Sequence, residues 1–241
     1  MGTAQSTEGL TESYARWRSS RLGQITDALE RQLLFELLSS VADKALLDVG
    51  CGDCALASEL SRRGAIVTGL DADPVMIAAA RRRFEIEGTQ LHLIEGQAER
   101  LPFDDAVFDR VVAVTVLCFV QDAARAVAEM ARVLKPGGRL VIGELGRLSL
   151  WAAHRRIRGW FGDPTWRAAI FRTALEFRGL ARVAGLDVVE IRGAVHYPPS
   201  EFAARLLAPV DQWLGRRTTF GAAFIAVSAT KPIEKASTEI H

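Results

Sequence analysis

From Ala45 onward, short aliphatic runs alternate along the chain with longer segments that have the 3.6-residue period of a helix. Parallel strands are buried on both faces and are joined by crossover helices. The alternation therefore predicts an α/β fold, in which a mainly parallel sheet is wrapped by helices on both sides. The expected strands cover residues 45–49, 65–70, 90–94, 110–115, 139–143, 187–191 and 222–228.

Residues typical of helix ends set the boundaries between these runs. A helix over residues 55–63 stops at Gly64, and the next begins with Asp73 as its N-cap and Pro74 in its first turn. Another helix, over 121–133, ends before the Lys-Pro-Gly-Gly run at 135–138, where proline blocks continuation and glycine permits a turn. A helix over 25–38 precedes the first strand.

The charges of the chain nearly cancel, with 30 Lys and Arg against 29 Asp and Glu in 241 residues. No global field draws such a chain to nucleic acid, so we expect no nucleic-acid partner. The first residues lack the features of a signal peptide, and no apolar run reaches the ~18 residues of a membrane span. We expect a single cytoplasmic domain over 1–241, with 1–12 disordered and 231–241 a flexible tail.

Three cysteines, Cys51, Cys54 and Cys118, are expected to be reduced thiols. The spacing of Cys51 and Cys54 also fits a redox or metal pair. However, the chain offers neither a second pair nor a neighbouring histidine to complete four ligands. We therefore expect no metal site, and small packing residues in a tight turn.

A glycine-rich segment, Asp48-Val49-Gly50-Cys51-Gly52-Asp53-Cys54, follows the first strand. Ligands of α/β sheets bind at the carboxyl ends of strands, and glycine lets the backbone approach a ligand closely. Through Ala55 the segment also fits the dinucleotide fingerprint G-x-G-x-x-A, so an NAD site is an alternative.

Asp71 ends the second strand, 19 residues beyond Gly52. This is close to the ~20 residues expected for an acid that accepts hydrogen bonds from ribose hydroxyls. Asp71 is also a candidate N-cap, but Asp73 beside Pro74 fills that role better. The two features together predict a nucleoside-containing ligand.

The complete set of motifs resembles the class I S-adenosylmethionine-dependent methyltransferases, in their small-molecule branch called type 11. The resemblance extends over about residues 14–232. It rests on five ordered motifs: Leu46-Leu47-Asp48-Val49-Gly50-Cys51-Gly52, Gly69-Leu70-Asp71-Ala72-Asp73-Pro74, Gly96-Gln97-Ala98-Glu99-Arg100-Leu101-Pro102-Phe103, Phe108-Asp109-Arg110-Val111-Val112 and Leu134-Lys135-Pro136-Gly137-Gly138.

This resemblance implies a Rossmann-like, doubly wound, seven-stranded sheet with its last strand antiparallel. It also implies that S-adenosylmethionine is the cofactor and that a small molecule accepts the methyl group. The implied cofactor residues are Asp48, Gly50, Gly52, Asp53, Asp71, Ala72, Gln97, Ala98 and Val114. Asp48 would receive the amino group of the methionine part, Asp71 the ribose, and Gln97 the adenine.

Two positions depart from the family pattern. A third glycine is usual where Cys54 stands, and an aspartate is more usual at Gln97. The rival NAD-dependent oxidoreductase loses support because neither Tyr14 nor Tyr197 is followed by a lysine four residues later. A cofactor-binding protein without catalytic activity is a further alternative.

A dedicated general base is optional for in-line methyl transfer, and histidine is the first candidate if one exists. His154 shares a helical stripe with Leu150, Ala153, Ile157 and Phe161, so we take it as the catalytic candidate. His196, in a later loop, is a weaker candidate. Cys118, after the fourth strand, is a candidate for contact with the substrate, and a small buried thiol is its alternative.

Residues 146–172 interrupt the alternation and are expected to form a lid-like insertion after the fifth strand. The insertion holds six arginines against one aspartate, together with Trp151, Trp160 and Trp166. Such a segment suits an anionic, aromatic or lipid-like acceptor, or a peripheral contact with a membrane surface. The alternative is a solvated arginine face with tryptophans packed inward.

Overall fold

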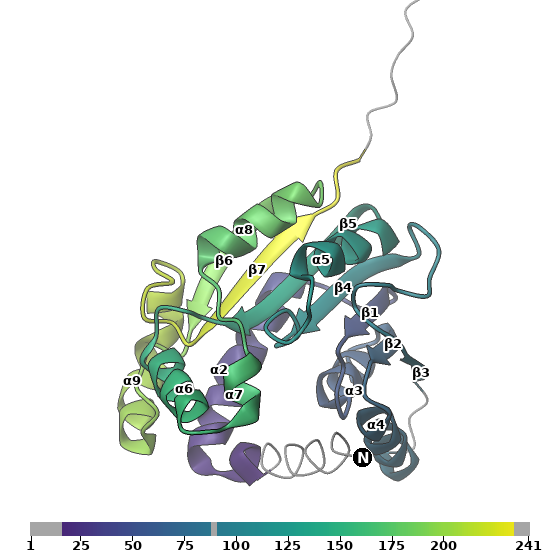
Figure 1. Ribbon diagram of the computed structural model, residues 1–241. Helices are drawn as coiled ribbons and strands as arrows, with labels where there is room; N and C mark the ends of the chain where they lie inside the picture. The colour runs from purple at the N-terminus through teal and green to yellow at the C-terminus, as the bar shows by residue number, and fades with distance from the viewer. Residues whose placement is uncertain (1–15, 88–90, 234–241) are drawn as a thin grey trace, which may run out of the picture.

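Seven strands form one mixed sheet in the computed structural model, which describes residues 16–87 and 91–233 (Figure 1). The strand order is β3-β2-β1-β4-β5-β7-β6, and β7 runs antiparallel to both β5 and β6. The α/β prediction with an antiparallel last strand is thus confirmed. The strands are β1 Ala45–Val49, β2 Ile66–Asp71, β3 His92–Glu95, β4 Phe108–Val114, β5 Leu134–Leu145, β6 Asp187–Ala194 and β7 Phe224–Thr230.

Helices cover both faces of this sheet. They are α2 Arg21–Leu38, α3 Ala55–Arg62, α4 Pro74–Glu87, α5 Ala123–Val133, α6 Leu150–Trp160, α7 Pro164–Ala168, α8 Ala174–Val183 and α9 Glu201–Gly215. Side chains fix several starts, as when Asp122 accepts a hydrogen bond from the amide of Arg125 at α5. Thr173 and Glu176 form a reciprocal capping box at α8.

An apolar core lies on each face of the sheet, and neighbouring residues of β1 contribute to different cores. Leu46 of β1 packs with the leucines of α2 and with α3 and α4, whereas Leu47 packs on the other face with α5 and α8. This is the alternation that a pleated strand imposes on successive side chains. Since both faces are apolar, the polar groups that serve a ligand are left to the ends of the strands.

The largest boundary difference concerns β5, which begins at Leu134 rather than at residue 139. Leu134 pairs with Phe108, and the amide of Gly137 donates to the carbonyl of Lys231, so the turn is drawn into the sheet. Lys231 in turn donates to the carbonyls of Arg132 and Leu134. The predicted tail is therefore anchored at its first residue. Residues 1–12, Gln90 and 234–241 lie outside the described residues.

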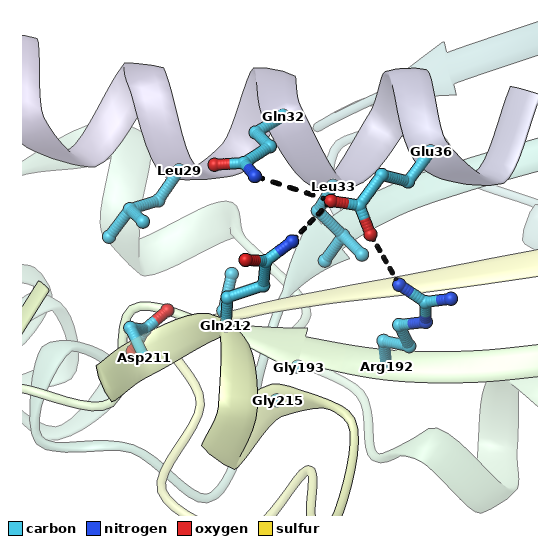
Figure 2. Close-up of a pocket in the computed structure, with 10 residues that line it drawn as sticks. Leu29, Gln32, Leu33, Glu36, Arg192, Gly193, Asp211, Gln212 and Gly215 are labelled. Atoms are coloured by element: carbon cyan, nitrogen blue, oxygen red, sulfur yellow. Dashed lines mark hydrogen bonds and ion pairs between the residues drawn. The ribbon is translucent and has the colours of Figure 1, made fainter. Parts of the chain in front are cut away.

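A polar junction ties α2 to the far end of the sheet (Figure 2). The Glu36 carboxylate of α2 accepts from Arg192 of β6 at 2.6 Å and also binds Gln212 of α9. The cavity at this junction has a volume of about 20 Å³. Since this is room for a single water, the junction is structural rather than a ligand site.

The insertion after β5 packs against the N-terminal helix. Trp151 of α6 donates its indole N–H to the carbonyl of Tyr197 at 2.9 Å, and the Tyr197 hydroxyl lies 3.1 Å from that of Thr26 on α2. Trp17 meets Trp151 edge to face. None of the helices in the described ranges has the length and hydropathy needed to cross a membrane.

Candidate functional site

The sheet register gathers the candidate residues at one edge. Asp48 pairs with Gly69 of β2 and Val112 of β4, so the carboxyl ends of β1, β2 and β4 lie together. The amide of Gly96, after β3, donates to the Asp71 carbonyl at 2.9 Å. Residues that are far apart in the sequence thus form one site, at the edge where α/β sheets bind ligands.

The glycine-rich loop turns tightly at the end of β1. The amides of Gly50 and Cys51 both donate to the Leu70 carbonyl, and Gly50 and Gly52 have left-handed backbone angles, with φ of 68° and 56°. A Cβ on Gly50 would lie 2.3 Å from Val116, but a Cβ on Gly52 would have no atom of the described residues within 4 Å. Gly50 is therefore required by packing, and Gly52 faces open space.

Asp71 holds this loop in place as well as facing the ligand edge. One carboxylate oxygen accepts from the Gly52 amide at 2.8 Å, and the other accepts from the Asp73 amide at 2.9 Å. Burial raises the pKa of Asp71, and these amide donors oppose that rise. A carboxylate has about four acceptor positions, so both oxygens can still accept hydroxyl donors.

Asp48 is buried and incompletely paired. Asp48 is the penultimate residue of β1 and is 2% exposed, and no described residue donates a hydrogen bond to its Oδ2. Burial, reinforced by the charges of Asp71 and Asp53, raises the pKa of Asp48 to about 8. A buried acceptor without a donor is costly, and a ligand that brings a cationic N–H group removes that cost.

Asp53 is paired with two arginines. The guanidinium of Arg83 binds its carboxylate and carbonyl, and Arg18 lies 3.5 Å from its Oδ1. These residues line a cleft of about 520 Å³ beside the N-terminal end of α2. Asp53 thereby ties the loop to α4, and its direct contact with a cofactor stays a prediction.

The candidate adenine contacts lie on the adjoining loops. Ala72 and the Gln97 side chain are exposed, whereas Ala98 is buried. The carbonyl of Gln97 accepts from the Arg100 amide at 3.1 Å, which closes a turn after β3. Val114 ends β4 and pairs with Gly143 of β5. Their contacts with adenine stay a prediction.

The three cysteines are free and buried. The nearby Cys54 thiol, followed by burial, raises the pKa of Cys51, so this thiol is unreactive. Among the described residues, no group of three or more His, Cys, Asp or Glu side chains is placed to hold a metal ion. Cys54 adopts a left-handed φ of 57°, the conformation for which glycine is the ordinary choice.

These features fit S-adenosylmethionine. The unpaired Oδ2 of Asp48 suits the ammonium group of the methionine part, the open side of Gly52 leaves room for that part, and Asp71 can accept from ribose hydroxyls. The rest of the edge offers an exposed amide side chain at Gln97 for a base.

Comparison with known proteins agrees with this geometry. Residues 47–142 match the methyltransferase domain family. The chain is 32% identical over 179 residues to a ubiquinone biosynthesis O-methyltransferase of Xylella fastidiosa, covering 71% of this chain and 72% of that protein. It is 40% identical over 116 residues to a demethylmenaquinone methyltransferase of Thermus thermophilus, covering 47% of this chain and 53% of that protein.

The fold agrees as well. A solved S-adenosylmethionine-dependent methyltransferase from Thermotoga maritima, titled as a possible histamine N-methyltransferase, superposes with a TM-score of 0.72. It shares 24% sequence identity, and the match covers 94% of this chain and 98% of that one. The chain is a class I S-adenosylmethionine-dependent methyltransferase of the type 11 branch. The oxidoreductase and the inactive binding protein are thereby set aside.

The structure corrects the location of His154 in this methyltransferase. His154 and its stripe on α6 are exposed, while Trp151, Ala152 and Gly159 on the opposite side are buried. Either face of α6 could have packed inward, and the face that carries the Trp151 indole is the buried one. His196 is also accounted for, since its ring nitrogens lie 3.0 Å from Asp211 and 3.2 Å from the Thr218 carbonyl, where they join β6 to α9.

Two carboxyl groups near the site were not anticipated from the sequence. Glu30 of α2 interacts electrostatically with Arg155 of α6, and burial raises its pKa to about 8. Glu144, the penultimate residue of β5, is 1% exposed and accepts from the amides of Val116 and Leu117. Burial raises the pKa of Glu144 to about 7. Each has a sequence signal, because each carboxylate interrupts or ends an otherwise apolar pattern.

The role of Asp71 predicts a large loss of cofactor affinity in Asp71→Ala. A hydrogen bond to a charged group contributes about 1.5–3 kcal/mol, which corresponds to about 10- to 150-fold in Kd. The Gly52 amide also loses its partner, so the upper half of this range is expected. Isothermal titration with S-adenosylhomocysteine measures the change, with circular dichroism as the check on folding. Unchanged affinity in a folded variant would remove Asp71 from the cofactor site.

The backbone of Cys54 predicts that Cys54→Gly is tolerated. A left-handed non-glycine residue is strained by about 1–3 kcal/mol, and removing the fully buried thiol costs an amount of similar size. The two effects should nearly cancel, leaving the free energy of unfolding within about 1 kcal/mol of the parent and cofactor affinity unchanged. Urea denaturation and titration test this. Loss of methyl transfer in the stable variant would give the thiol a chemical role.

Proposed function

We propose that the acceptor binds between α2 and the insertion, at the edge of the sheet beyond β4 and β5. The observation that carries this proposal is the contact between α6 and α2, in which Trp151 donates to the Tyr197 carbonyl and the Tyr197 hydroxyl lies 3.1 Å from that of Thr26. Glu30 of α2 and Arg155 of α6 interact electrostatically across the same region. The charges of both Glu144 and Arg155 act on the pKa of the Cys118 thiol, which follows β4, so these three groups share one region. On this proposal, α2 and residues 146–172 act as the lid of a single domain spanning 1–241.

An aromatic or anionic acceptor suits the walls of this region. Arg155 lies over the rings of Trp151 and Trp166, at 5.2 Å and 5.0 Å from their centroids. Trp166 in turn stacks on Phe171. Indole faces and a guanidinium group bind planar rings and negative charge. The names of the two quinone-related relatives support an aromatic, lipid-like acceptor.

Glu30 replaces His154 as the proposed general base. S-adenosylmethionine supplies an electrophilic methyl group on its sulfonium when bound. A Glu30 carboxylate with a pKa near 8 can take a proton from an acceptor O–H or N–H near neutral pH. Glu144 accepts from the amides of Val116 and Leu117 through Oε1, so it holds the loop after β4 in position, while its Oε2 has no donor among the described residues.

The cytoplasm is the proposed compartment, because all three cysteines are free thiols. Fractionation of cells that express a tagged chain tests this.

The role of Glu30 predicts a selective loss of turnover. An extract incubated with the enzyme and isotopically labelled S-adenosylmethionine first identifies the acceptor by its mass shift. With that acceptor, Glu30→Gln should lower kcat about 100-fold or more, and should leave the affinity for S-adenosylhomocysteine unchanged. In the parent, kcat should rise with pH up to about 8, where Glu30 becomes ionised, and this rise should disappear in Glu30→Gln.

His154→Ala and Glu85→Gln serve as matched controls, because both residues are exposed on other faces. Both variants should keep the parental kcat. If Glu30→Gln keeps full turnover, or if His154→Ala loses it, the proposed base is wrong.

A further inference from the structure

The outer face of α9 carries large apolar side chains instead of polar ones. Phe202, Leu206, Val210 and Trp213 are 78%, 65%, 51% and 58% exposed. Their spacing of four, four and three residues places them on one face of the helix. The buried face holds Ala204, Asp211 and Gly215. The helix thus packs its small residues inward and turns its large ones outward, the reverse of an ordinary surface helix.

The outer face of α6 has the same character. Leu150, Ile157, Trp160 and Phe161 are exposed, with Phe161 at 88%. This is the stripe that also contains His154. A stripe of this composition on the surface is unusual for a monomeric protein and indicates a binding surface.

The two stripes meet at their ends. The amide of Gly221, beyond α9, donates to the carbonyl of Leu148, before α6, at 2.9 Å. Leu148 and Phe220 beside this bond are both exposed. In Figure 1, α6 and α9 lie at the same end of the molecule, away from β3. Five of the six exposed aromatic side chains in the described residues belong to this region: Trp160, Phe161, Phe202, Trp213 and Phe220.

Positive charge surrounds this apolar surface. Arg205, Arg216 and Arg217 are exposed on or after α9, and the Arg217 guanidinium lies 4.1 Å from the centroid of the Trp213 ring. The insertion adds three exposed arginines, Arg147, Arg158 and Arg167, of which Arg147 pairs with Glu176 and Arg158 with Asp163. The whole chain has a net charge of only +1. A twofold contact between two copies of this surface would place arginines opposite arginines, which is unfavourable. Anionic headgroups complement the charge instead.

We propose that the outer faces of α6 and α9 dock the enzyme on an anionic lipid bilayer. Tryptophan and phenylalanine side chains enter the boundary between headgroups and acyl chains, and arginines extend to the phosphates. The docking proposal stands on this surface alone. A second step rests on the proposed function. Arg155 of α6 lies on the side of that helix that adjoins the proposed acceptor region, so docking of the outer face brings this region close to a lipid-like acceptor.

Sedimentation with vesicles tests the proposal. The full chain should bind phosphatidylcholine vesicles that contain phosphatidylglycerol, and bind pure phosphatidylcholine more weakly. Combining Phe161→Gln, Phe202→Gln and Trp213→Gln should reduce binding at least tenfold. The double variant Arg205→Ala and Arg217→Ala should lose about fivefold per arginine, and this loss should shrink at high salt.

Matched controls remove the same groups elsewhere. Ile86→Gln with Leu175→Gln removes two exposed apolar side chains of α4 and α8, and Arg81→Ala with Arg82→Ala removes two exposed cations of α4. Both controls should bind vesicles like the parent. Affinity for S-adenosylhomocysteine should be parental in every variant, which separates failed docking from a failed active site.

Two results would overturn the docking proposal. One is vesicle binding that is absent in the parent or unchanged in the triple variant. The other is a parent with twice the monomer mass of 26.3 kDa in light scattering, falling to the monomer mass in the triple variant. That result would assign the surface to a second copy of the chain.

Discussion

The buried carboxyl group of Asp48 sets the requirements for the surrounding structure. Asp48 is the penultimate residue of β1, between β2 and β4, and is 2% exposed, and no described residue donates to its Oδ2. An unsatisfied buried acceptor of this kind destabilises the free protein by about 1–3 kcal/mol. The two apolar cores on the faces of the sheet offset that cost. The site is thus built in advance for a cationic donor.

Four carboxyl groups lie near the carboxyl edge of the sheet, and the different partners of each give it a different role. Asp71 fixes the glycine-rich loop through the Gly52 amide, and Glu144 fixes the loop after β4 through two amides. Asp48 retains an unpaired Oδ2, and Glu30 interacts electrostatically with Arg155 on the proposed acceptor side. Burial raises the pKa of all four. The enzyme therefore combines rigid loop anchors with groups that can exchange protons near neutral pH.

Local sequence rules predicted the turn after β1 and its link to Asp71, whereas they did not predict which side of α6 is buried. The interval from Gly52 to Asp71 is short and lies within one strand-helix-strand unit, so its spacing fixes the geometry. The face that α6 turns inward depends instead on Trp151 fitting against Tyr197, a residue 46 positions later. Periodicity identifies an apolar stripe on a helix but does not show which side of the helix is buried. For this reason His154 was expected in the site, although it is exposed. Glu30 was missed because its role depends on Arg155 from a distant helix.

The direct test of this account is the proton balance of cofactor binding. Because the pKa of Asp48 is about 8 in the free protein, the group is mostly protonated at pH 7. An incoming ammonium group favours the ionised form, so binding S-adenosylhomocysteine should release a proton, and affinity should rise from pH 6 to about 8. Isothermal titration in two buffers of different ionisation enthalpy measures the release. In Asp48→Asn, both the release and the pH dependence should be absent. Equal affinity across this range with no proton release in the parent would contradict the role of Asp48.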